Sequence, residues 1–182
     1  MTVIHTIGHS VRALEELVAL LRREGVTHVA DVRAHPGSRR HPHFHRDALA
    51  AALPGYGIAY SHHPGLGGRR RGSKDSPNGA WRNASFRAYA DYMSTDEFQT
   101  AMDALVALGR TATVAIMCAE AVPWRCHRWL ISDALVAREI EVRHILDSRS
   151  QPHSLTNFAA IRDGRVIYPS AGTGEAQEEL FG

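Results

Sequence analysis

Apolar residues occur along this chain in two patterns, short continuous runs and longer stretches with helical spacing. Each short run predicts a buried β-strand, and each longer stretch predicts a helix with one apolar face. The predicted strands cover residues 3–7, 27–32, 57–61, 113–117 and 141–146. The predicted helices cover the segment between Ser10 and Gly25, residues 46–53, 86–93 and 96–108, and a stretch that begins near Cys126.

The first three elements form a βαβ unit of ordinary length. Ser10 is a suitable N-cap for the first helix, Leu14, Leu17 and Leu21 recur on one of its faces, and Gly25 ends it. We therefore expect the first two strands to form a parallel pair joined by a right-handed crossover.

Strands that alternate with helices along the whole chain predict an α/β fold. We expect one domain over residues 1–168, with a mostly parallel five-stranded sheet covered by helices on both faces, as in Rossmann-like and flavodoxin-like folds. The predicted strand order is 3-2-1-4-5, with 2-1-3-4-5 as the alternative. A small hairpin around Asp163 and Gly164 should follow, and residues 169–182 should form a loose tail.

Composition and charge narrow the class of protein. Of the 182 residues, 44% are apolar and 22% charged, which is ordinary for a soluble globular protein. No apolar run reaches the roughly 18 residues of a membrane span, and the amino terminus lacks a signal-peptide pattern. These features predict a cytoplasmic protein without a membrane partner, and the net charge of +2 excludes a polyanion binder that acts through its overall charge.

Positive charge is nevertheless concentrated in two long loops, residues 33–46 and 65–79. Lys74 is the only lysine, and arginine, the other basic residue, binds phosphate through its planar fork. A nucleic acid or a nucleotide is therefore a candidate partner. A codon bias toward arginine and a solvated basic loop explain the same residues without a ligand.

The stretch from residue 113 to residue 130 combines a buried strand, a polar turn and a helix start. Glu120 in the turn is the candidate general acid, base or nucleophile, with Asp31 at the end of another strand as its possible partner. Cys118 is a candidate nucleophile near Arg125, His127 and Arg128, because a helix N-terminus stabilises a thiolate. A buried structural thiol and carboxylates that cap helices are the alternative interpretations.

The two cysteines lie in this same stretch, and their spacing matches neither a CxxC redox motif nor a zinc ribbon. We expect free thiols. An alternative to an enzyme is a metal-binding or ligand-binding protein without turnover, with Cys118, Cys126, His127 and His144 around the ligand. No HExxH spacing supports this alternative, so the primary hypothesis assigns no metal, and the sequence identifies no cofactor.

Several motifs together resemble the bacterial proteins catalogued as domain of unknown function 488. These motifs are TIGHS, DVR, GLGGRRRGSKDSPNGAWRNASFRAYADYM, MCAEAVPWRCHR and VRHI. The resemblance extends from about residue 3 to residue 168. It implies a common fold and site, whereas the label of DNA repair that such proteins sometimes carry implies little about the reaction.

Because parallel strands end at one edge of a sheet, Ser10, Asp31, His62, Glu120 and His144 are expected to converge there. We predict an enzyme, a hydrolase or transferase, that acts on a nucleic acid or a nucleotide-type substrate, with Glu120, Asp31, Cys118 and His127 as catalytic residues. The predicted substrate-binding residues are Gly8, His9, Ser10, Arg33, Arg69, Arg70, Arg125 and Arg128.

Overall fold

The structure is a computed structural model that describes residues 1–171. Its centre is a six-stranded sheet in the order β3-β2-β4-β1-β5-β6, in which all strands are parallel except β6. The strands are β1 (Val3–Gly8), β2 (His28–Asp31), β3 (Ala59–His62), β4 (Val114–Cys118), β5 (Glu141–Ile145) and β6 (Ser150–Pro152). The mixed α/β class predicted from the alternating pattern is confirmed.

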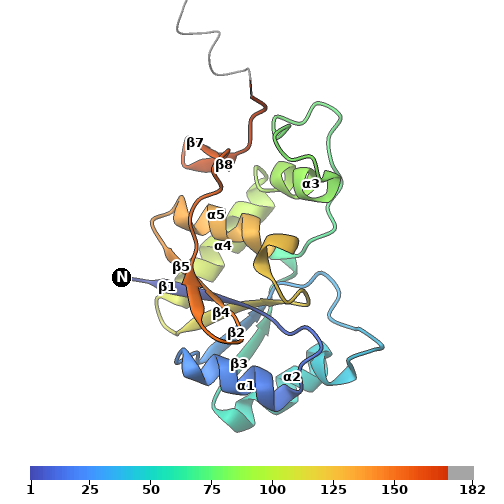
Figure 1. The fold of residues 1–182 in the computed structure, drawn as a ribbon, viewed down its shortest axis with the longest axis vertical. Helices are drawn as coiled ribbons and strands as arrows, with labels where there is room; N and C mark the ends of the chain where they lie inside the picture. Colours follow the sequence, from blue (N-terminus) through green and yellow to red (C-terminus); the bar gives the residue numbers. More distant parts are fainter. Residues whose placement is uncertain (172–182) are drawn as a thin grey trace, which may run out of the picture.

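Helices cover both faces of this sheet (Figure 1). On one face lie α1 (Leu14–Arg23) and α2 (Arg46–Ala52). On the other lie α4 (Asp96–Gly109) and α5 (Arg128–Val136), with α3 (Ala84–Tyr92) packed beyond them. Short 3-10 turns occur at η1 (Pro42–Phe44), η2 (Leu53–Tyr56), η3 (Pro64–Leu66) and η4 (Pro123–Arg125).

Alternation along the strands divides the apolar side chains between two cores. In β4, Val114, Ile116 and Cys118 face the core formed with α3, α4 and α5, whereas Ala115 and Met117 face the core formed with α1 and α2. All five residues are buried, because the sheet is covered on both sides. Whether a residue occupies an odd or an even position along its strand therefore determines which face of the sheet its side chain reaches.

Both predicted strand orders are wrong. β4 lies between β1 and β2, so these two strands do not pair with each other as the βαβ unit predicted, but each pairs with β4. The connection from β3 to β4 runs through α3 and α4 and returns the chain to the middle of the sheet. Periodicity identifies such a crossover but carries no information on which strand it will reach.

Two further details differ from the predictions. Ser10 is not the N-cap of α1, because residues 9–12 form a turn first and Ala13 occupies the cap position. The sheet also has a sixth strand, β6, which was not predicted because its three residues include a proline. It is an edge strand, where a missing N–H is tolerated.

The C-terminal hairpin is present as predicted. It consists of β7 (Ala160–Arg162) and β8 (Arg165–Ile167), joined by Asp163 and Gly164, which both have positive φ. This conformation is what a two-residue hairpin turn requires. Most of the predicted loose tail, residues 172–182, lies outside the described residues. None of the helices in residues 1–171 has the length and apolar character needed to cross a lipid bilayer.

Candidate functional site

A cleft of about 470 Å³ lies where β4 passes through its polar turn into α5. Its volume falls within the range of small-ligand sites in proteins. The wall toward β4 and α5 carries Cys118, Glu120, Cys126 and His127. The opposite wall is formed by the two basic loops and α3, through Arg33, Ala34, His35, Gly68, Arg69, Ser85, Phe86 and Tyr89. Ala119 and Arg125 complete the lining.

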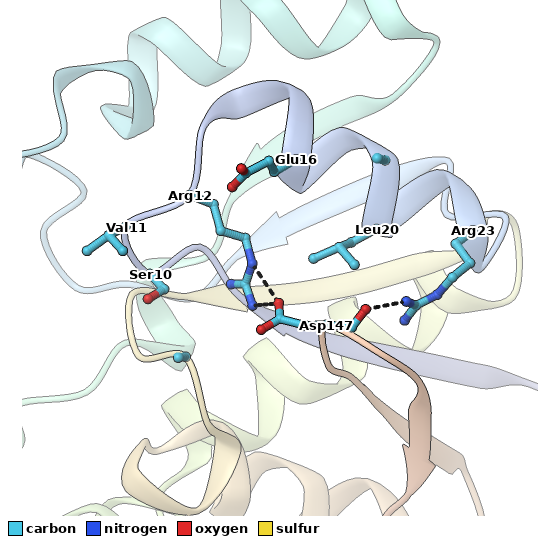
Figure 2. Close-up of a pocket in the computed structure, with 9 residues that line it drawn as sticks. Ser10, Val11, Arg12, Glu16, Leu20, Arg23 and Asp147 are labelled. Carbon is cyan, nitrogen blue, oxygen red and sulfur yellow. Dashed lines mark hydrogen bonds and ion pairs between the residues drawn. The ribbon is translucent and has the colours of Figure 1, made fainter.

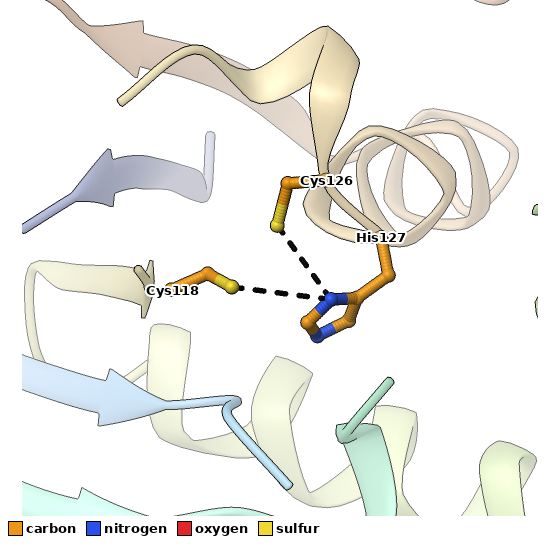
Figure 3. Close-up of side chains that lie close together, drawn as sticks. All are labelled: Cys118, Cys126 and His127. Atoms are coloured by element: carbon orange, nitrogen blue, oxygen red, sulfur yellow. Dashed lines mark hydrogen bonds between the residues drawn. The ribbon is translucent and has the colours of Figure 1, made fainter. Parts of the chain in front are cut away.

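Three of these side chains, Cys118, Cys126 and His127, form a thiol–imidazole cluster (Figure 3). His127 Nδ1 lies 3.6 Å from Cys126 Sγ and 4.0 Å from Cys118 Sγ, and all three atoms lie within 4.8 Å of one another. Both cysteines are buried and free, which confirms the prediction of thiols. The cluster joins the end of β4 to the start of α5, because η4 folds the intervening turn back onto the strand.

The other ring nitrogen of His127 fixes the orientation of the imidazole. Nε2–H donates a hydrogen bond of 2.9 Å to the carbonyl oxygen of Val32 at the end of β2. In the neutral ring this donor leaves the Nδ1 lone pair free, and Nδ1 is the atom that faces the two thiols. Tyr89 packs against the ring from α3.

The pKa values of the two thiols shift in opposite directions, because the thiols share a hydrogen bond. The hydrogen bond to Cys126, together with burial, raises the pKa of Cys118 well above its usual value. Burial also opposes ionisation of Cys126, but its hydrogen bond with Cys118 and the positive charge of Arg128 hold the pKa of Cys126 well below its usual value. The pKa of Cys126 is therefore held below that of Cys118.

Arg128 is buried, with 1% of its surface exposed, and its positive charge acts on both thiols of the cluster. Its guanidinium donates to the carbonyl oxygen of Glu120 at 2.5 Å and to Thr6 Oγ1 at 3.4 Å, while its Nε has no partner. Among residues 1–171 no carboxylate forms an ion pair with it. Arg128 therefore does not line the cleft, where it was predicted to contact substrate. It supports the turn through the carbonyl of Glu120, and its charge lowers the pKa of Cys126.

Three charged side chains of the cleft are exposed and unpaired. Glu120, Arg69 and Arg125 form neither a hydrogen bond nor an ion pair through their side chains with any of residues 1–171. Arg69 has a φ of 61°, so the glycine-rich loop turns sharply where it reaches the cleft. These groups can meet a ligand without first giving up a partner in the protein.

Asp31 does not reach Glu120, contrary to the prediction. Asp31 has the opposite parity to Val32 and Ala30, so its carboxylate lies on the α1 and α2 side of the sheet. It is fully buried and accepts hydrogen bonds from Arg33 Nε at 2.8 Å, Arg33 Nη2 at 2.6 Å and Tyr60 OH at 2.6 Å. Burial and the hydrogen bond with Asp31 raise the pKa of Tyr60. Asp31 is therefore a structural counterion of Arg33, which lines the cleft with its charge already neutralised.

Gly8, His9 and Ser10 do not line the cleft either. A Cβ on Gly8 would lie 1.7 Å from the carbonyl oxygen of Glu120, so this glycine admits the chain's own turn rather than a ligand. His9 is buried, stacks on Phe44 and donates from Nδ1–H to the carbonyl oxygen of Ser10 at 2.9 Å. Burial lowers the pKa of His9 to about 4.

Ser10 lines a different and larger hollow, of about 650 Å³, between α1 and the end of β5 (Figure 2). Its charges are already satisfied. Arg12 pairs with Asp147 at 2.5 Å, and Arg23 donates to the carbonyls of Asp147 and Leu146. We therefore place the candidate site in the cleft of the thiol–imidazole cluster, which is smaller but contains unpaired charges and thiols.

Other predicted residues are held by structural contacts. Arg70 donates to the carbonyls of Gly67 and Pro64, and its guanidinium lies 3.6 Å from the centre of the Tyr92 ring. His62 bonds to the carbonyl of Arg33 at 2.8 Å. His144 is buried on the α5 side, between Thr6 and His153, and belongs neither to the cleft nor to the thiol–imidazole cluster.

The sequence therefore located Cys118, Glu120, Arg125 and His127 in one site but missed the groups that complete it. The carbonyl of Val32 and the backbone of Gly68 carry no side-chain signal, since a carbonyl is present at every position. Gly68 approaches His127 closely, because a Cβ there would lie 3.1 Å from Nδ1. Only the packing of the glycine-rich loop against α5 reveals it.

Residues 13–135, well over half of the chain, match the family model described as domain of unknown function DUF488. The match includes the DVR and MCAEAVPWRCHR motifs, and hence the whole thiol–imidazole cluster, whereas TIGHS and VRHI lie outside it. No curated protein and no solved structure matches the chain. The extent of the family match shows that this chain belongs to the DUF488 family.

Proposed function

We propose that this protein is an enzyme, a hydrolase or transferase, that acts on a phosphate-bearing substrate of the nucleotide or nucleic-acid type. The observation that carries the proposal is the pairing, in one cleft, of two unpaired arginines with nucleophilic and proton-transferring groups. Arg69 and Arg125 supply positive charge, and Glu120, Cys126 and His127 supply the chemistry. The cleft is large enough for a nucleotide.

Arginine is the side chain best suited to this task, because its planar fork forms two parallel hydrogen bonds with phosphate. Arg69 comes from the glycine-rich loop and Arg125 from η4, so they approach the cleft from different segments. A substrate phosphate held between them would lie beside Glu120, the exposed carboxylate of the turn. Glu120 can then serve as general acid or base for the group attached to that phosphate.

Binding can be tested with AMP and with a short single-stranded oligonucleotide as probes. Replacing Arg69 and Arg125 by alanine should weaken binding of the oligonucleotide and reduce its log–log salt slope by about 0.7 for each phosphate that the protein no longer neutralises. Arg162→Ala is the matched control, because Arg162 is an exposed arginine on the remote β7 strand. Equal affinity and slope in the double variant would place phosphate binding elsewhere.

Turnover can be tested by incubating the same probes with enzyme and separating the products by chromatography. Glu120→Gln should lower the rate by about 10²–10⁴-fold while probe binding persists, because the amide cannot transfer a proton. Glu15→Gln, a change of an exposed glutamate on α1, should leave the rate unchanged. A Glu120→Gln variant with the full rate would refute the assigned role.

A further inference from the structure

The geometry points to a divalent metal site, best suited to zinc, that is formed by Cys118, Cys126 and His127 with a fourth position open to the cleft. This inference deepens the proposed function, because it names a cofactor for the same cleft and assigns Cys126 and His127 to the chemistry as ligands of that ion. Its evidence is nevertheless independent of any substrate: it rests on the distances among three ligand atoms and on what surrounds them.

The distances agree with tetrahedral coordination. With a Zn–S bond of about 2.3 Å and a Zn–N bond of about 2.0 Å, a tetrahedral ion holds its sulfur and nitrogen ligands about 3.5 Å apart and two sulfur ligands about 3.8 Å apart. The observed distances from His127 Nδ1 are 3.6 Å to Cys126 Sγ and 4.0 Å to Cys118 Sγ. The two sulfur atoms lie within 4.8 Å of each other. Shifts of a few tenths of an ångström would bring the three atoms onto one ion.

The supporting contact of the histidine is also the one that metal ligands have. A histidine that binds a metal through one nitrogen usually donates its other N–H to a carboxylate or a backbone carbonyl, which sets the tautomer and the ring orientation. His127 makes this bond to the carbonyl oxygen of Val32 at 2.9 Å. Its Nδ1 lone pair is thereby directed at the two sulfur atoms before any ion is present (Figure 3).

Space for an ion beside Nδ1 depends on Gly68. A Cβ at this position would lie 3.1 Å from His127 Nδ1, so any larger residue would crowd the third ligand atom. On the remaining side, the cluster borders the cleft lined by Glu120 and Arg125. Three protein ligands with an accessible fourth position are typical of a catalytic zinc site, whereas structural zinc sites use four protein ligands.

Thiolate and imidazole ligands select zinc over magnesium or calcium, which prefer oxygen. A zinc ion bound here would lower the pKa of a water molecule in its fourth position to about 7, so that hydroxide would be available at neutral pH. Glu120 lines the same cleft and can accept the proton that this water releases. The buried His144, which the sequence grouped with these ligands, is excluded, because it bonds instead to Thr6 and His153.

The decisive experiment measures metal content and metal affinity of the full chain without a histidine tag, kept reduced with a phosphine. Elemental analysis of the purified protein should find zinc near one equivalent. After removal by a chelator, titration with cobalt(II) should produce the absorption of a tetrahedral ion with thiolate ligands. Zinc added at about a hundredfold excess over its Kd should raise the Tm of the apoprotein by roughly 5–10 °C.

Two variants and one matched control locate the site. Cys118→Ser and His127→Gln should each weaken zinc binding by more than the roughly 10–100-fold that loss of a supporting hydrogen bond costs. His35→Gln is the control, because His35 is an exposed histidine of the same cleft outside the cluster, and it should bind zinc like the wild type.

Three results would overturn the site: reduced wild-type protein that takes up less than a tenth of an equivalent of zinc, a cobalt spectrum without thiolate bands, or wild-type affinity in both variants. Should the variants fail to fold, the cobalt spectrum of the wild type decides alone. A protein that takes up no zinc and still turns over a phosphate probe would refute the metal site and leave the proposed function standing. Zinc binding without any phosphate binding would refute the proposed function and leave the metal site standing.

Discussion

Replacing Asp133 with alanine is expected to lower the free energy of unfolding by about 3–5 kcal/mol, the cost of removing one partner from a buried charged network. Asp133 lies in α5, is fully buried and accepts four hydrogen bonds from the segment that follows β5. The donors are Thr156 N at 2.9 Å, Thr156 Oγ1 at 2.6 Å, Tyr168 OH at 2.7 Å and His153 Nε2 at 2.9 Å.

The magnitude follows from these contacts. A hydrogen bond to a charged group contributes about 1.5–3 kcal/mol, but the four contributions do not add, because the C-terminal segment can detach and hydrate its donors. For a chain of this size the change corresponds to a Tm about 6–20 °C lower. Asp133→Asn should cost less, since its oxygen can still accept from His153 and Thr156 N while the hydroxyls rotate to accept from its amide.

Urea unfolding followed by circular dichroism measures the stability, and hydrogen exchange shows where it is reduced. Exchange should accelerate first in residues 153–168, which Asp133 holds against α5, and much less in β4. Asp75→Ala, an exposed aspartate of the glycine-rich loop, should stay within about 0.5 kcal/mol of the wild type. A loss of less than about 1 kcal/mol in the free energy of unfolding of Asp133→Ala would refute this role of the network. Hydrogen exchange that accelerates uniformly along the chain would refute it too.

Gly8→Ala should lower the Tm severely, since its Cβ would lie 1.7 Å from the carbonyl oxygen of Glu120, whereas Gly55→Ala, with open space around it, should change the Tm little. A similar Tm in the two variants would contradict the close approach. Stability in urea should also fall as the pH drops from about 6.5 toward 3, because burial lowers the pKa of His144 to about 3 and the unfolded chain takes up its proton first. His153, Arg128 and Asp133 are the charged groups around this ring. Because the unfolded state binds at most one more proton at this site than the native state, the free energy of unfolding can change by at most about 1.4 kcal/mol per pH unit. His144→Gln should flatten the slope by up to that amount, and an unchanged slope would exclude His144 as its source.

Local patterns in the sequence were sufficient to predict most elements of this fold. The helix predicted at residues 96–108 is α4 (Asp96–Gly109), and the strand predicted at 113–117 is β4 (Val114–Cys118). The hairpin follows from Asp163 and Gly164, since both positions require a positive φ. The cleft wall formed by Cys118, Glu120 and His127 could be predicted for the same reason: one short strand, turn and helix start contain it.

The tertiary structure decided the rest, because it depends on contacts between residues far apart in sequence. Periodicity placed Asp31 and Glu120 at the same edge of the sheet, but alternation along the strands puts Asp31 toward α1 and α2 and Cys118 toward α5. The order of strands depends on the path of each crossover over the sheet, which put β4 between β1 and β2. The carbonyl of Val32 and the backbone of Gly68 meet His127 only because β2 and the glycine-rich loop pack beside α5. No side-chain pattern encodes such backbone contacts, so the completed site was visible only in three dimensions.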